Sequence, residues 1–199
     1  MTADTEPRTP VGTEEPRPSS LMHGPAAQCT ALRTVAAGLV AATLGESLTR
    51  MFPALELGLF AGGAARLAAL FTGSPVVRTE QGWALPAGSS PVVVTAACSA
   101  TSFFVIVAAI VAWQLARRGR PVAFAALAGL VAALPVAIFI NSLRIVTVAQ
   151  AHRWVIPLFP DSFGPFLHLL TGVAVFLPSL IALNLILEHH GHRHTRSNS

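Results

Sequence analysis

The sequence contains no lysine and little charge of either sign. All 13 basic residues are arginine, and charged residues make up 11% of the 199 residues, against about 25% in soluble domains. The missing lysine excludes a P-loop, whose lysine contacts nucleotide phosphates, and it excludes a lysine Schiff base. The low charge and a hydrophobic content of 53% exclude a disordered chain and argue against a soluble domain.

Cysteine is also scarce, and the basic residues are not clustered as a nucleic acid would require. Cys29 and Cys98 are the only cysteines and lie far apart in the sequence, so neither a CxxC redox pair nor a disulfide framework is possible. The net charge of +4 comes from scattered arginines, which do not form a nucleic-acid-binding patch. The remaining class is an integral membrane protein without a nucleic-acid partner.

Long apolar runs predict an all-α polytopic membrane protein with about five transmembrane helices, because about 20 apolar residues cross a bilayer. Three runs, residues 97–116, 121–140 and 166–187, contain no Asp, Glu or Arg. Two weaker runs, residues 31–48 and 55–71, include Glu46, Glu56 and Arg66, so each either crosses the bilayer or lies partly at its surface. We count both as spans.

Composition divides the chain into three parts. Residues 1–28 are rich in Pro, Thr, Glu and Ser and predict a disordered tail. Residues 29–188 form the transmembrane domain, and residues 189–199 form a tail rich in His and Arg. Between the second and third spans, residues 72–96 combine Gly, Pro and Ser with short valine runs, which predicts a small hairpin or lid. Trp83, in this segment, and Trp154 are expected to be anchors at the membrane interface.

Positive charge in short loops predicts the orientation, because such loops stay in the cytoplasm. The loop of residues 117–120 holds three arginines, so we expect it, and the His/Arg-rich tail, to be cytoplasmic. Residues 72–96 are then extracytoplasmic. With five spans the N-terminal tail is outside, and with one fewer it is cytoplasmic. The expected location is the plasma (inner) membrane, with several passes.

This topology brings three reactive side chains to the outer face: Cys98, Arg144 and His168. Cys98 at the start of a helix feels the positive end of the helix dipole, which favours the thiolate. His168 is suited to take the thiol proton and return it to a leaving amine. Arg144 is suited to stabilise an oxyanion or to bind a substrate carboxylate. Apart from Asp161, no acidic residue is expected near this group.

Each residue also has an ordinary structural interpretation. A cysteine in a membrane helix often only packs, an arginine at the end of a span often extends to the headgroups, and a histidine there is often interfacial. A non-enzymatic alternative is therefore a small transporter or assembly subunit that uses Arg144 and His168 as a polar path.

The segments around these residues resemble the motifs of the exosortase and archaeosortase family. Residues 97–103 (ACSATSF) resemble its cysteine motif, residues 141–145 (NSLRI) its asparagine-x-leucine-arginine motif, and residues 168–172 (HLLTG) its histidine-x3-glycine motif. Residues 70–76 (LFTGSPV) resemble the stretch that leads into its extracytoplasmic segment. The resemblance covers about residues 55–187 and is that of a compact, divergent member.

The resemblance implies a membrane-embedded cysteine protease or transpeptidase without a cofactor or metal. Its substrate would be a membrane-anchored exported protein with a C-terminal sorting signal, and its acceptor an amine, a lipid or a glycan. Cys98 would be the nucleophile, Arg144 the electrostatic partner and His168 the acid/base, with supporting roles for three residues: Asn141, Ser99 and Gly172. The family usually has glycine where this chain has Ala100, and the extra bulk is expected to narrow access to the thiol.

Overall fold

A computed structural model describes residues 25–87, 90–154 and 164–196 of the chain. Most of these residues are helical, and the prediction of an all-α polytopic membrane protein is confirmed. A small antiparallel sheet is the exception. In chain order the elements are α1 (Pro25–Met51), α2 (Pro53–Leu55), the π-helix η1 (Glu56–Ala61), α3 (Gly62–Thr72), β1 (Val77–Thr79), β2 (Gly82–Ala87), β3 (Ser90–Val94), the 3₁₀ helix η2 (Ala96–Cys98), α4 (Thr101–Arg117), α5 (Val122–Trp154) and α6 (Gly164–Arg196).

Every predicted span corresponds to helix. Four helical segments are long and apolar enough to cross a membrane: Gln28–Met51, Pro53–Thr72, Val122–Trp154 and His168–His189. The apolar helix Thr101–Arg117 is shorter, because the run predicted to begin at residue 97 first forms η2 and becomes α-helical at Thr101. At the other ends, helix α5 continues to Trp154 and α6 continues to Arg196, so the backbone of the predicted His/Arg-rich tail remains helical up to that residue.

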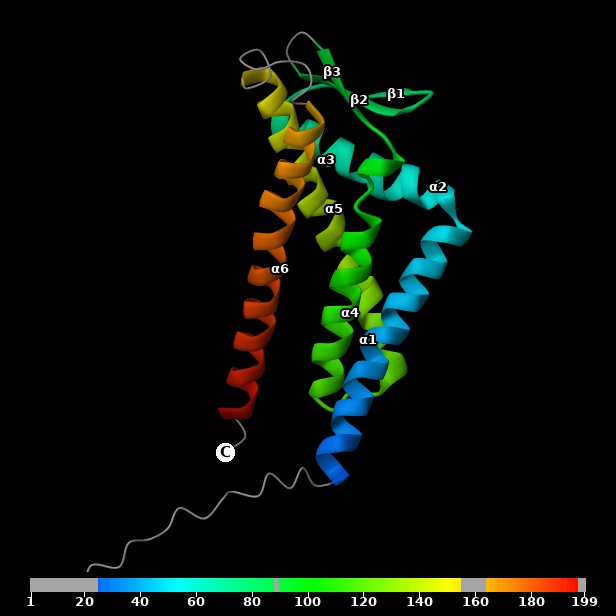
Figure 1. Cartoon of the computed structure of the whole chain (residues 1–199), viewed down its shortest axis with the longest axis vertical. Helices are drawn as coiled ribbons and strands as arrows, with labels where there is room; N and C mark the ends of the chain where they lie inside the picture. The colour runs from blue at the N-terminus through cyan, green and yellow to red at the C-terminus, as the bar shows by residue number, and fades with distance from the viewer. Residues whose placement is uncertain (1–24, 88–89, 155–163, 197–199) are drawn as a thin grey trace, which may run out of the picture.

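The arginine loop, residues 117–120, marks one end of the helix bundle. Arg33, near the start of α1, donates hydrogen bonds of 2.7 Å to the carbonyl oxygens of Gly119 and Arg120. Arg118 donates to the carbonyl oxygen of Leu187, late in α6. The beginning of α1 and the end of α6 therefore lie at the same end of the bundle, as Figure 1 also shows.

The segment from α2 to α3 differs in direction from the other helices. In Figure 1, α1, α4, α5 and α6 run along the long axis of the molecule, whereas α2 and α3 run across the end opposite the arginine loop. This segment has the length and composition of a span, whereas the direction seen in Figure 1 favours the surface-lying alternative for residues 55–71. Because α2 and α3 connect α1 to α4 at that end without returning along the bundle, α1 and α4 run in opposite directions. The start of α1 therefore lies at the arginine-loop end.

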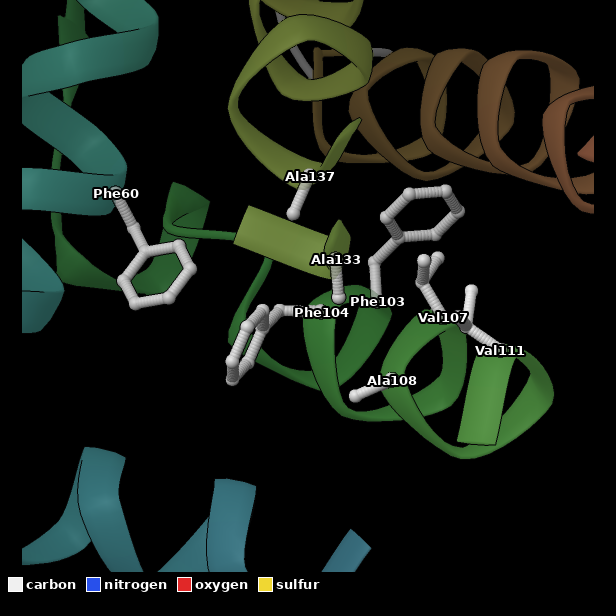
Figure 2. Packing of buried hydrophobic residues seen from close by; sticks show 8 residues of the cluster. All are labelled: Phe60, Phe103, Phe104, Val107, Ala108, Val111, Ala133 and Ala137. Atoms are coloured by element: carbon white, nitrogen blue, oxygen red, sulfur yellow. The ribbon is translucent and has the colours of Figure 1, made fainter. Parts of the chain in front are cut away.

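The bundle is held together by small residues and a few aromatic rings. A Cβ atom on Gly129 of α5 would come 2.6 Å from the carbonyl oxygen of Ala108 in α4, so glycine allows these backbones to approach closely. Figure 2 shows Phe60 of η1 pointing toward Phe104 of α4, and their ring centroids are 5.0 Å apart in an edge-to-face arrangement. The crossing segment is thereby packed onto the bundle.

Where a small hairpin or lid was predicted, β1, β2 and β3 form a three-stranded antiparallel sheet in the order β1-β2-β3, one strand more than a hairpin. Trp83 of β2 is 9% exposed, and its indole Nε1–H donates to the carbonyl oxygen of Leu57 at 3.2 Å. The expectation that Trp83 anchors the protein at the membrane interface is therefore wrong, since its ring attaches the sheet to the crossing segment. Trp154 is 65% exposed, as an interfacial anchor would be.

Candidate active site

Three separate elements bring Cys98, Arg144 and His168 together. Cys98 is the last residue of η2, Arg144 lies in α5, and His168 lies in the first turns of α6. The sulfur of Cys98 is 3.7 Å from Nε2 of His168, and Nη2 of Arg144 is 2.8 Å from the same nitrogen. Strand β3 borders these three residues, and Figure 1 shows β3 at the end of the bundle opposite the loop between α4 and α5. A thiol and a guanidinium from two distant parts of the sequence therefore both contact the imidazole of His168.

The contact between Arg144 and His168 determines which imidazole nitrogen carries the proton. A guanidinium has only donors, so Nε2 of His168 must accept in this hydrogen bond. The neutral imidazole then carries its proton on Nδ1, and the unprotonated Nε2 also faces the Cys98 sulfur. His168 thus presents to the thiol the nitrogen that a general base needs.

The turn that carries Cys98 differs from the predicted helix start. Cys98 donates its backbone N–H to the carbonyl oxygen of Thr95 within η2, and Ala100 follows with φ 57° and ψ 28°, a left-handed conformation. That conformation costs a residue with a Cβ about 1–2 kcal/mol, and glycine avoids the cost. The left-handed conformation of Ala100 is therefore a source of backbone strain two residues after Cys98.

Asn141 of α5 forms a hydrogen bond to the backbone of Cys98. Its side-chain amide Nδ2 donates to the backbone carbonyl oxygen of Cys98 at 2.7 Å, and the residue is completely buried. A buried backbone carbonyl needs such a partner. Asn141 therefore supports the position of the Cys98 backbone.

Gly172 provides the space that Arg144 occupies. A Cβ atom on Gly172 would lie 3.3 Å from Nε of Arg144, and the Arg144 guanidinium also stands 5.3 Å from the ring centre of Phe176, as in a cation–π contact. Within the described residues, Nε of Arg144 is buried and has no hydrogen-bond partner. Buried donors without a partner are rare in folded proteins, so this atom sets Arg144 apart from the other side chains of the site.

Ser99 contacts an acidic residue that the sequence did not lead us to expect. Its hydroxyl donates to Oε1 of Glu56 at 2.7 Å, and Ser99 is 3% exposed. The expectation that no acidic residue except Asp161 lies near this group is therefore wrong, because the crossing of α2–α3 over the end of the bundle brings Glu56 to the cysteine turn. Asp161 lies outside the described residues.

A cavity of about 160 Å³ opens onto the three reactive side chains. His152 and the β3 strand also line it. The sequence prediction missed His152 because the span was expected to end at residue 140, whereas α5 continues to Trp154. The spacing of eight residues from Arg144, close to two helical turns, was the available signal. Across residues 25–87, 90–154 and 164–196, no three His, Cys, Asp or Glu side chains gather as a metal would require.

Comparison with known proteins agrees with the resemblance found in the motifs. The family model described as "Transmembrane exosortase" (Exosortase_EpsH) matches residues 19–185, which includes the three motif segments and begins upstream of α1. Neither the search of curated proteins nor the search of solved structures gave a match. A family match over most of the chain supports, in general, a transpeptidase or protease type of function in a membrane. The chain belongs to the transmembrane exosortase family.

Proposed function

We propose that this protein is a cysteine transpeptidase that cleaves the C-terminal sorting signal of membrane-anchored exported proteins through a thioester on Cys98. The observation that carries the proposal is the meeting of three groups, with Cys98 Sγ and Arg144 Nη2 both close to Nε2 of His168. The acyl group held on Cys98 is then transferred to an acceptor amine, lipid or glycan.

In the first half of the reaction, the Cys98 thiol gives its proton to Nε2 of His168 and its sulfur attacks the carbonyl carbon of the scissile peptide bond. Nε2 can take this proton only when Arg144 releases it, because a protonated Nε2 no longer accepts a hydrogen bond. The Arg144 guanidinium then donates to the oxyanion that forms. The carbon–nitrogen bond breaks, His168 returns its proton to the leaving amine, and the acyl group remains on sulfur.

In the second half, an acceptor amine or hydroxyl attacks the thioester carbonyl. Nε2 of His168 takes the acceptor proton and passes it to the departing Cys98 sulfur, which restores the thiol. His168 therefore acts twice, first as base and acid for cleavage and then in the same roles for transfer.

The distribution of arginine supports placing the site on the extracytoplasmic face of the plasma membrane. The arginine loop is the short basic loop that the positive-inside rule assigns to the cytoplasm. The reactive group and the sheet lie at the opposite end of the bundle. A substrate anchored by a single helix would then present its exported part to the cavity.

A membrane-impermeant maleimide applied to intact cells tests this proposal. In a Cys29→Ser background, where Cys98 is the only cysteine, we expect the reagent to label Cys98 and to stop the shortening of a co-expressed exported protein that ends in one transmembrane helix and a basic cluster. Full labelling of Cys98 with undiminished shortening would contradict the proposal and favour a transporter or assembly subunit. Labelling only after permeabilisation would contradict the assigned side.

A further inference from the structure

The residue two positions after the nucleophile has a backbone conformation that its side chain does not favour. Ala100 has φ 57°, and it is the one non-glycine residue with positive φ in the part of the chain that the structure describes. Its carbonyl oxygen accepts from the N–H of Phe104, so the left-handed residue joins the cysteine turn to the first turn of α4. If Ala100 relaxed, Cys98 would move relative to α4.

One carboxylate oxygen joins the residues on both sides of Ala100. Oε1 of Glu56 accepts from the hydroxyl of Ser99 at 2.7 Å and from that of Thr101 at 3.3 Å. The two hydroxyls are also 3.4 Å apart. Hydrogen bonds to a charged acceptor are stronger than those between neutral groups, so this arrangement resists any change at the residue between them.

The position of Glu56 is itself fixed by packing. Glu56 begins the π-helix η1, and the carbonyl oxygen of the next residue, Leu57, accepts from the indole of Trp83. At the other end of η1, Phe60 packs edge to face on Phe104 of α4. Single π-helical turns are frequent at functional sites, and this one presents a carboxylate to the turn that follows the nucleophile.

We propose that Glu56 is a positioning residue, which clamps the Ser99 and Thr101 hydroxyls so that Ala100 stays left-handed and Cys98 stays within reach of His168. The proposal rests on the proposed function, because it assigns Cys98 and His168 their roles as nucleophile and base. Glu56 acts through the turn, since its hydrogen bonds go to Ser99 and Thr101. A glycine at position 100 would need no such clamp, because glycine adopts positive φ without a steric cost.

The rate at which iodoacetamide alkylates Cys98 tests the clamp without a substrate. The full-length protein is purified in detergent with Cys29→Ser, and alkylation of the remaining cysteine is followed by mass spectrometry. We expect Glu56→Ala to slow alkylation about tenfold, close to the rate of His168→Ala, because the thiol loses its base. Glu56→Gln is expected to stay within about threefold of the parent protein, because its amide oxygen still accepts from both hydroxyls.

Rescue by glycine separates positioning from a general structural role. The double variant Glu56→Ala/Ala100→Gly is expected to alkylate within about twofold of the parent protein, because glycine keeps the turn without the carboxylate. Glu46→Ala is the control, since Glu46 is an exposed acidic residue paired with Arg50, and its rate is expected to be unchanged. Glu56→Ala/His168→Ala is expected to be no slower than His168→Ala alone.

If a folded Glu56→Ala variant were alkylated at Cys98 as fast as the parent protein, the proposal would be overturned. So would failure of Ala100→Gly to restore the rate in a folded double variant. If Glu56→Ala does not fold, a rate of Glu56→Gln as low as that of His168→Ala overturns the proposal, and a near-parental rate supports it. Substrate processing by Cys98→Ala would contradict the proposed function and leave the alkylation rates, and therefore the clamp, unaffected.

Discussion

The place of the Arg144 guanidinium depends on two neighbours in α6, one turn apart. His168 accepts its hydrogen bond, and Gly172 leaves it space. The glycine of the histidine-x3-glycine motif therefore has a steric reason in this chain, because any side chain at that position would press on the guanidinium. Under the proposed function, this matters because a donor to the oxyanion must be held in a fixed position.

At the residue scale, we predict that Gly172→Ala lowers the proposed substrate processing by displacing Arg144. The new Cβ would lie 3.3 Å from Nε of Arg144, so the guanidinium must shift, and we expect the rate of substrate processing to fall about tenfold. Gly58→Ala is the matched control, because a Cβ there meets nothing within 4 Å. If Gly172→Ala processed substrate at the parental rate while Arg144→Ala was inactive, the space that Gly172 leaves for the guanidinium would not be needed.

The side chains that lie in the three motif segments were easier to predict than the acidic side chain that the crossing helix brings to them. Cys98, Arg144 and His168 follow from helix topology, because each lies near the end of a long apolar run. Glu56 does not follow from it, because its contact with Ser99 depends on a helix that crosses the bundle end. The left-handed conformation of Ala100 could not be predicted either, since a sequence shows side-chain volume but not the sign of φ.

At the scale of elements, the sheet and α3 are attached through the indole of Trp83. This ring packs so closely on the helix that a Cβ on Gly62 would lie 2.8 Å from its Nε1 atom. The guanidinium of Arg66 stands 4.8 Å from the ring centre on the same helix. Since β3 lines the reactive cavity, this attachment also shapes the site.

We predict that Gly62→Ala destabilises the protein and that Gly63→Ala does not. The first substitution forces the Trp83 ring from its place, for which overpacking costs of about 1–3 kcal/mol are typical. The second places its Cβ 3.6 Å from Ile138, an ordinary contact. Thermal unfolding of the two variants in detergent, followed by circular dichroism, measures the difference. Equal stabilities would contradict the close packing of Trp83 on α3.

Element boundaries were predictable where charge or turn residues interrupt an apolar run, and less so elsewhere. The arginine loop separates α4 from α5 as expected. The continuation of α5 beyond residue 140 was not expected, because Asn141, Ser142 and Arg144 resemble the polar end of a span. The structure instead buries Asn141 and Ser142 inside the protein, so polarity there marks an internal site.

At the scale of the whole molecule, the path of the chain places the start of α1 and the end of α6 at the arginine-loop end. Counting all five apolar segments as crossings places the N-terminal tail on the opposite side. The difference arises at one segment, Pro53–Thr72, whose length and composition fit a span but whose course lies across the bundle end. Hydropathy alone does not distinguish these two placements.

We predict that both termini face the cytoplasm. Green fluorescent protein and alkaline phosphatase, each fused in turn to the N- and C-terminus, report the side, because the first fluoresces after cytoplasmic folding and the second is active only after export. Fluorescence without phosphatase activity is expected at both ends, in agreement with the three arginines of the arginine loop. Phosphatase activity at the N-terminus alone would support five crossings and contradict this path.

The central claim is that Cys98 forms the covalent bond to the substrate. Its most direct measurement is the size of a co-expressed exported protein with a C-terminal transmembrane helix and basic cluster, in cells that carry the parent protein, Cys98→Ala or Cys29→Ala. We expect the substrate to be shortened by the parent protein and by Cys29→Ala, and to stay at full length with Cys98→Ala. Undiminished shortening by Cys98→Ala would show that Cys98 is not the nucleophile.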